Sequence, residues 1–126
     1  MEPTQITEIQ ERHYHDQHLD LDFGNKTVLL DSEPLTLTRK EYDLLAFLIQ
    51  HAGELVSRET LLLRVWGYSN QIRTRTLDVH ILRLRRKLGE HSGKYLETVV
   101  NAGYRFLPFR GPRLGRRQPQ MFALGA

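Results

Sequence analysis

The stretch TRTLDVHILRLRRKLG, Thr74 to Gly89, decides the fold of this chain. With 3.6 residues per helical turn, four apolar side chains fall within about one sixth of the circle. These are Leu77, Ile81, Leu84 and Leu88. The opposite face carries Arg75, Val79, Leu82, Arg83 and Arg86, with Asp78, His80, Arg85 and Lys87 on the flanks. The spacing therefore predicts a helix that buries one stripe and exposes a basic face.

Charge is distributed unevenly along the chain, although the formal net charge is only +3. Up to Glu33 there are eight acidic and two basic residues, a balance of −6, whereas residues 73–87 hold six basic residues and one acid, a balance of +5. No acid follows Glu97, but five arginines do. A lone basic face is often only solvated, yet asymmetry of this kind favours a polyanionic partner, with nucleic acid first.

Two capped helices precede the basic one. Thr38-Arg39-Lys40-Glu41 has the pattern of a capping box and begins a helix that should stop near Ala52-Gly53. Ser57 is placed to cap a second helix, which Gly67 ends. Residues 67–73 form a loop, and Thr74 is placed to cap the third helix. The pair of helices with its short connection predicts a helix-turn-helix variant.

Short strands flank the helices on both sides. Alternating apolar residues predict strands at 19–23 and 27–30, and a third strand is expected at 35–37 after a turn. Residues 95–100 and 104–107 flank the turn Asn101-Ala102-Gly103 and predict a hairpin in the position of a wing. The fold class is therefore α+β: a winged helix-turn-helix with a small N-terminal antiparallel sheet, three helices and a C-terminal β-hairpin.

The chain of 126 residues has the length of one domain with two loose ends. We expect a flexible N-terminus or linker at 1–17, the folded domain at 18–109 and a basic disordered tail at 110–126. There is no cysteine, which excludes disulfides and cysteine-bound zinc and fits a cytoplasmic protein. No apolar run approaches the roughly 20 residues of a membrane span, and the first ten residues do not form a secretory signal.

Enzymatic chemistry has little support in the residues. No P-loop, nucleophile elbow or HExxH string is present, so we expect no enzyme and no cofactor. The segment HYHDQH, His13 to His18, could hold zinc or nickel, but an incidental cluster in a mobile segment is the preferred interpretation. His80 is better placed for phosphate contact than for catalysis, and Trp66 should be mostly core.

Three separated motifs carry a resemblance to a known family. They are SRE…LL…VWG at 57–67, RTLDVHI.RLRRKL at 75–88, and GYRF at 103–106. In this order and spacing they resemble the effector domain of OmpR/PhoB-type response regulators, over about residues 19–107. The resemblance implies a four-stranded N-terminal sheet, three helices and a hairpin wing. It also implies sequence-specific binding of double-stranded DNA, with the third helix in the major groove.

The resemblance also implies roles for individual residues. Arg83 matches the main base-reading arginine, Val79 a position that meets a thymine methyl, and Arg75, His80 and Arg85 match phosphate contacts on the recognition helix. Arg58 and Trp66 match backbone contacts from the second helix, and Thr98 and Tyr104 contacts from the wing. The full predicted interface is Arg58, Trp66, Arg73, Arg75, Thr76, Val79, His80, Leu82, Arg83, Arg85, Arg86, Thr98 and Tyr104.

Two positions depart from the family pattern. Val100 stands where many members carry an arginine that enters the minor groove, and Leu82 stands where many have a basic or polar residue. Loss of one phosphate contact should reduce the salt slope of binding by roughly 0.9. The chain is also too short for a receiver domain, so we expect either an excised effector or a stand-alone protein.

Two classes of function remain open at this stage. The first is a transcription regulator that binds direct repeats as tandem copies, a homodimer on DNA. The alternative is a protein-interaction module that contacts RNA polymerase through loop 67–73 and binds DNA only weakly. Structured RNA is less favoured, because a helix cannot enter the narrow A-form major groove.

Overall fold

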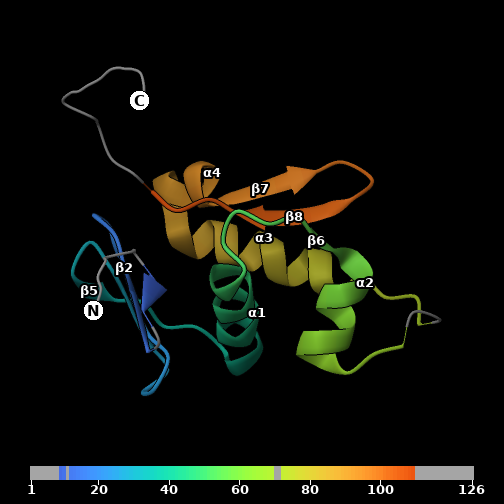
Figure 1. Cartoon of the computed structure of the whole chain (residues 1–126), viewed down its shortest axis with the longest axis horizontal. Coiled ribbons are helices and arrows are strands. Elements are labelled where there is room, and N and C mark those ends of the chain that lie inside the picture. Colours follow the sequence, from blue (N-terminus) through green and yellow to red (C-terminus); the bar gives the residue numbers. More distant parts are fainter. Residues whose placement is uncertain (1–8, 11, 70–71, 110–126) are drawn as a thin grey trace.

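The computed structural model describes residues 9–10, 12–69 and 72–109. A five-stranded antiparallel sheet at one end is followed by helices and then a three-stranded sheet (Figure 1). The first half consists of β1 (Ile9–Gln10), β2 (His13–His15), β3 (Leu19–Asp22), β4 (Thr27–Leu30), β5 (Glu33–Pro34), α1 (Arg39–Gln50) and β6 (Val56–Ser57). The second half consists of α2 (Arg58–Leu61), η1 (Leu62–Trp66), α3 (Thr76–Leu88), η2 (Gly89–His91), α4 (Ser92–Tyr95), β7 (Leu96–Val99) and β8 (Gly103–Phe106).

The N-terminal sheet is a meander in the order β1-β2-β3-β4-β5. It contradicts the expectation of a loose segment up to residue 17, because β2 pairs with β3 through Tyr14 and Leu21. Both of these side chains are fully buried. In β2 the buried Tyr14 lies between two exposed histidines, which is the alternation of a half-buried strand. The predicted strand at 35–37 is also misplaced, since the pairing residues are Glu33 and Pro34. The described sheet therefore has five strands, not the implied four. The predicted tail at 110–126 lies outside the described residues.

Helix α1 forms the centre of the core. Its capping box is present: the Thr38 hydroxyl accepts the Glu41 N–H at 3.2 Å, and the Glu41 carboxylate accepts the Thr38 N–H at 2.9 Å. The stripe predicted on α3 is confirmed, because its four apolar side chains are at most 1% exposed. Lys87 at the end of α3 donates to the buried Glu41 carboxylate at 2.6 Å. This ion pair joins the two longest helices.

The second helix begins and ends as predicted but changes type midway. The Ser57 hydroxyl accepts the Thr60 N–H at 3.1 Å, and Gly67 ends the helix with a φ of 77°. Between them, α2 passes into the π-helical segment η1. The predicted cap of α3 is wrong, because Arg75 occupies the N-cap position. Thr74 still supports this end, since its hydroxyl accepts the Thr76 N–H at 3.1 Å.

The wing is a hairpin of β7 and β8, extended by β6 into a sheet of order β6-β8-β7. The sequence pattern missed β6, which is only two residues long. The pairing of β6 with β8 explains why position 103 is a glycine, because a Cβ there would lie 2.1 Å from the Val56 carbonyl oxygen. The strand predicted at 95–100 is shorter, because Tyr95 belongs to the single turn α4. The close pairing anchors the wing beside the start of α2.

None of the helices in the described part of the chain is long and apolar enough to cross a membrane.

Candidate nucleic-acid interface

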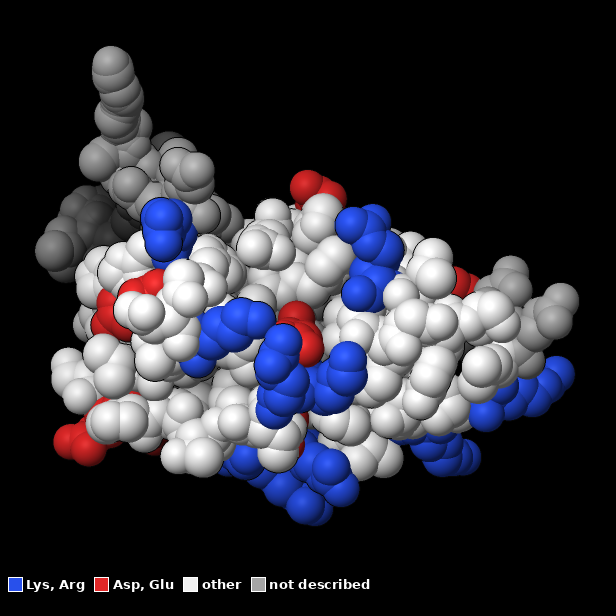
Figure 2. All heavy atoms as spheres, turned by 90° about the horizontal axis from the view of Figure 1, so that it is seen from below, with Lys and Arg blue, Asp and Glu red and all other residues white. Residues whose placement is uncertain are grey.

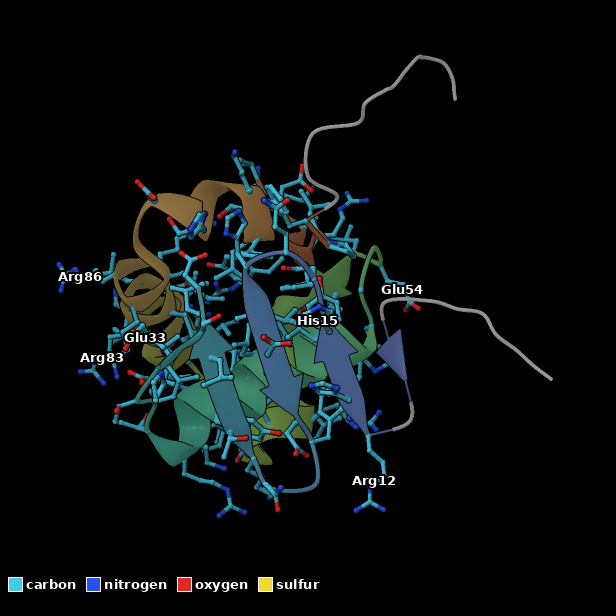
Figure 3. The ribbon with its side chains drawn as sticks, turned by 90° about the vertical axis from the view of Figure 1, so that its left-hand side faces the viewer. Arg12, His15, Glu33, Glu54, Arg83 and Arg86 are labelled. Atoms are coloured by element: carbon cyan, nitrogen blue, oxygen red, sulfur yellow. The ribbon has the colours of Figure 1, made fainter. Side chains whose placement is uncertain are left out.

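The outward face of α3 carries the residues that the helical spacing placed there. Val79 is 37% exposed and Leu82 is 48% exposed, and Arg75, Arg83 and Arg86 are exposed as well. Within the described residues, neither Arg83 nor Arg86 forms a hydrogen bond or an ion pair. Both project outward from the same side of the molecule (Figure 3). Their guanidinium groups can therefore bind an outside acceptor without breaking an internal bond.

Asp78 lies at a junction of three elements. Its carboxylate accepts two bonds from Arg58, at 2.5 and 3.1 Å, and one from the Tyr104 hydroxyl at 2.8 Å. The hydrogen bond from Arg58 holds the pKa of Asp78 below its usual value. Burial, and then the bond to Asp78, raises the pKa of Tyr104. The carboxylate thus ties the start of α2 and the wing strand β8 to the first turn of α3.

The junction changes how Arg58 and Tyr104 are interpreted. Both were predicted as phosphate contacts, and the structure brings them together, but on a carboxylate of the same chain. Helical spacing places Asp78 on a flank of α3 and predicts no contact for it. The sequence did contain a sign that Asp78 matters. It is the acid in the first turn of an otherwise basic helix, where the positive end of the helix dipole stabilises a carboxylate.

Arg85 makes a second link between α3 and the wing. Its Nη2 donates to the Leu96 carbonyl at 3.0 Å and to the Thr98 hydroxyl at 2.7 Å. Two residues predicted to contact phosphate are again bonded to each other. Helix α3 is therefore held to the wing at its start by Asp78 and near its end by Arg85.

Trp66 and His80 pack against each other at the connection between helices. Their rings meet edge to face with centroids 5.0 Å apart, and both residues are half-buried. The His80 Nδ1 donates to the Thr76 carbonyl at 2.7 Å, which fixes the ring and leaves Nε2 for a further partner. Trp66 is partly buried and packs against the core, as expected for its large ring. Its contact with a DNA backbone stays a prediction.

The loop before α3 is described only in part, because residues 70–71 lie outside the described ranges. Ile72 is 47% exposed and Arg73 is also exposed. A hollow beside the loop is lined by Arg58, Glu59, Leu62, Ser69, Ile72, Arg73 and Thr74. At the other edge of the interface, Val100 at the wing tip is 77% exposed. The wing therefore presents an apolar residue at its tip.

Basic side chains also gather on the surface seen from below the view of Figure 1. In Figure 2, Lys and Arg side chains group at the centre and along the lower edge of the surface shown. Acidic side chains are scattered between some of these groups, so the surface is mixed rather than uniformly positive. This surface therefore carries cationic groups in addition to the outward arginines of α3 (Figure 3).

The fold and these features agree with known proteins. The family model described as "Transcriptional regulatory protein, C terminal" matches residues 32–106. The phosphate regulon transcriptional regulatory protein PhoB of Klebsiella pneumoniae is 44% identical over 92 residues, covering 71% of this chain and 40% of PhoB. The uncharacterized transcriptional regulatory protein YclJ of Bacillus subtilis is 49% identical over 82 residues, 64% of this chain and 36% of YclJ. The chain thus spans about two fifths or less of these two relatives.

The fold of this chain also matches that of a solved DNA-binding domain. The RstA DNA-binding domain of Klebsiella pneumoniae, crystallised in complex with the RstA box, superposes with a TM-score of 0.72 at 33% identity. The match covers 79% of this chain and 100% of the RstA domain. The chain belongs to the family of transcriptional regulatory protein C-terminal domains, the OmpR/PhoB-type effector domains.

Proposed function

We propose that this domain binds duplex DNA sequence-specifically and regulates transcription, with α3 in the major groove and the β7–β8 hairpin along the neighbouring backbone. The observation that carries the proposal is the outward face of α3, where Arg83 and Arg86 are exposed and unpaired among the described residues. A bidentate arginine can bind O6 and N7 of guanine. The crystallised complex of the related RstA domain with the RstA box supports the same use of the fold.

The internal bonds of the interface support two kinds of role. Arg83 is proposed to read a base and Val79 to meet a thymine methyl, because both side chains are exposed on the outward face. Arg58, Arg85, Thr98 and Tyr104 are bonded within the chain, so we propose that they position α3 and the wing and contact phosphate only with their remaining donors. Arg73, Arg75, Thr76, His80 and Arg86 complete the proposed phosphate and groove contacts.

The decisive experiment is selection of bound duplexes from a random pool. Sequence-specific binding predicts a recurrent motif, and tandem copies predict two such motifs in direct repeat, about one helical turn of 10–10.5 base pairs apart. A pool that shows no enrichment after several rounds, with folded protein throughout, would contradict the proposal. A single motif without a repeat would contradict only the tandem arrangement.

A contact with RNA polymerase is a further proposal for the 67–73 loop. It is supported by the exposed apolar side chain of Ile72 next to the exposed Arg73. The alternative function is an interaction module that binds DNA only weakly. A salt titration of DNA binding distinguishes this alternative from the proposed sequence-specific regulator. Tight binding to one duplex at physiological salt excludes that alternative, which the RstA complex already disfavours. Binding to genomic DNA would place the domain in the cytoplasm.

A further inference from the structure

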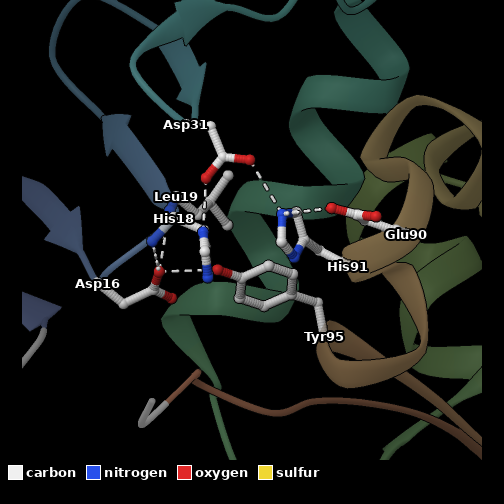
Figure 4. Close-up of polar contacts among 7 residues, drawn as sticks. All are labelled: Asp16, His18, Leu19, Asp31, Glu90, His91 and Tyr95. Atoms are coloured by element: carbon white, nitrogen blue, oxygen red, sulfur yellow. Dashed lines mark hydrogen bonds and ion pairs between the residues drawn. The ribbon is translucent and has the colours of Figure 1, made fainter. Parts of the chain in front are cut away.

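Two histidines and one aspartate from distant parts of the chain converge beside the N-terminal sheet. The ligand atoms of His18, Asp31 and His91 all lie within 4.8 Å of one another (Figure 4). We propose that these three residues bind a divalent transition-metal ion of the zinc class. The proposal does not depend on DNA binding.

The three donors come from three different turns. His18 lies between β2 and β3, where its N–H donates to the Asp16 carboxylate at 2.8 Å. Asp31 follows β4, and its N–H donates to the His18 carbonyl at 2.7 Å. His91 ends the 3₁₀ turn η2 directly after α3. Backbone bonds thus fix two of the donors relative to each other, and η2 brings the third from the recognition helix.

The side chains are arranged around the Asp31 carboxylate. His18 Nδ1 lies 2.5 Å from Oδ1, and His91 Nε2 lies 2.9 Å from Oδ2. The two imidazole rings stack with centroids 4.1 Å apart, and the rings of Phe109 and His18 meet edge to face with centroids 4.7 Å apart. Each ring therefore directs a nitrogen at the same carboxylate from one side. A metal ion between the three donors would replace these two short contacts.

The donor set and spacing fit zinc. Bonds of 2.0–2.1 Å in tetrahedral geometry place two ligand atoms about 3.3 Å apart. The two nitrogen–oxygen separations of 2.5 and 2.9 Å are somewhat shorter than that value, and all three ligand atoms lie within 4.8 Å of one another, so modest rotations of the side chains suffice. Two imidazoles and one carboxylate are a donor set that zinc uses with water in the fourth position. Magnesium and calcium prefer sites built from oxygen.

The site is accessible and has a candidate fourth ligand. The Asp31 side chain is 51% exposed, whereas those of His18 and His91 are 21% and 12% exposed. An ion can therefore approach from the carboxylate side while the imidazoles stay packed. The Glu90 carboxylate lies 4.0 Å from His91 Nε2 on an exposed side chain and can alternate with water. A bound ion would tie the N-terminal sheet to the segment after α3.

The histidines that the sequence placed together do not share this site. Of the HYHDQH segment, only His18 reaches the cluster. His13 and His15 are exposed on β2 with ring centroids 6.4 Å apart, and His15 pairs with Asp20, with no third ligand group joining them among the described residues. His15 is thus a matched control: an exposed histidine beside an aspartate on the same sheet, without a third donor.

Equilibrium dialysis of the whole metal-free chain against Zn²⁺ tests the proposal. We expect one ion per chain and a rise in melting temperature that a chelator reverses. Asp31→Asn and His91→Ala should each weaken binding at least about tenfold, since outer-shell changes alone cost 10–100-fold. Asparagine suits position 31, where φ is 51°, so Asp31→Asn removes the carboxylate without straining the turn.

The controls separate this site from adventitious binding. His15→Ala should bind Zn²⁺ as the unmodified chain does. So should His51→Ala, because His51 lies at the end of α1 beside Glu54 and outside the cluster. Mg²⁺ should not raise the melting temperature. Unchanged zinc affinity in both Asp31→Asn and His91→Ala overturns the proposal and leaves an adventitious ion only. Loss of binding in His15→Ala also overturns it and assigns the ion to the exposed histidines of β2. Circular dichroism of each variant shows whether a loss reflects unfolding.

Discussion

The basic residues of α3 form two groups that differ in where their charge is neutralised. Arg83 and Arg86 point outward and have no partner among the described residues. Arg85 and Lys87 are bonded within the chain, to the wing and to α1 respectively. The groups alternate along one helix, because each step of one residue turns the side chain by about 100°. Similar side chains therefore serve recognition or positioning according to their angle on the helix.

The largest expected effect comes from removing a positioning charge. Lys87→Met keeps the apolar stem but leaves the Glu41 carboxylate, 1% exposed, with Thr38 as its remaining partner among the described residues. We expect the free energy of unfolding to fall by about 2–3 kcal/mol, below the full cost of breaking a buried pair because Lys87 is partly exposed. Urea denaturation measures the change. Arg86→Met is the control and should unfold like the unmodified domain. An equal loss of unfolding free energy in both variants would contradict the division into outward and internally bonded residues.

The counterpart on the recognition side is Arg83→Ala. We expect it to lose about 2 kcal/mol of discrimination between the selected duplex and a scrambled one, roughly thirtyfold, with little change in unfolding. Competition binding with both duplexes measures the ratio. Arg39→Ala is the control, since Arg39 pairs with Asp43 on the exposed side of α1. Sequence preference that survives in Arg83→Ala would show that another residue reads the base.

A smaller effect in both measurements is expected from Arg85→Ala. Loss of its bonds to the Leu96 carbonyl and Thr98 should lower the free energy of unfolding by about 1 kcal/mol. Binding should weaken by a similar factor for all sequences, because the wing is less firmly held. A double-mutant cycle with Thr98→Val measures the coupling energy. A coupling energy of zero would mean that the two side chains act independently.

The Asp78 junction should show itself in the pH dependence of stability. A carboxyl group whose pKa is lowered on folding stabilises the fold above its ordinary value of 3.8, and this contribution is lost as the pH falls through the lowered pKa. The stability difference between the unmodified domain and Asp78→Asn should therefore be constant above about pH 5 and shrink in acid. Urea titrations of both proteins between neutral pH and pH 2.5 measure it. Parallel curves throughout would contradict the assigned ion pair.

Much of the fold could be predicted because its signals are local. The Thr38 capping box, the Ser57 cap, Gly67 and the apolar stripe of α3 each lie within a few residues of the element they define. The strands β2 and β6 were missed for the opposite reason. Two or three residues hold too little pattern, and their pairing with β3 and β8 depends on the tertiary fold.

In the candidate interface, too, local features could be predicted from the sequence and contacts between distant elements could not. The outward residues of α3 follow from helical angle, so Arg83 and Leu82 could be placed from the sequence alone. The partners of Arg58 and Arg85 could not, since they lie 20 and 13 residues away along the chain on other elements. The spacing shows which side chains leave the core, whereas only the folded chain shows which of them are already bonded.

Leu82 allows the smallest and most direct change to the outward group. It is 48% exposed, next to Arg83, on the face of α3 that is proposed to meet the DNA. Leu82→Arg should add one phosphate contact, tighten binding to all duplexes and steepen the salt slope by roughly 0.9. If Leu82 contacts a thymine methyl, the ratio of selected to scrambled binding should fall at the same time. If it packs instead against a neighbouring copy, cooperativity on the direct repeat should fall while that ratio is unchanged. Titrations of single and repeated sites at several salt concentrations distinguish the two, because only the second outcome requires two copies on the DNA.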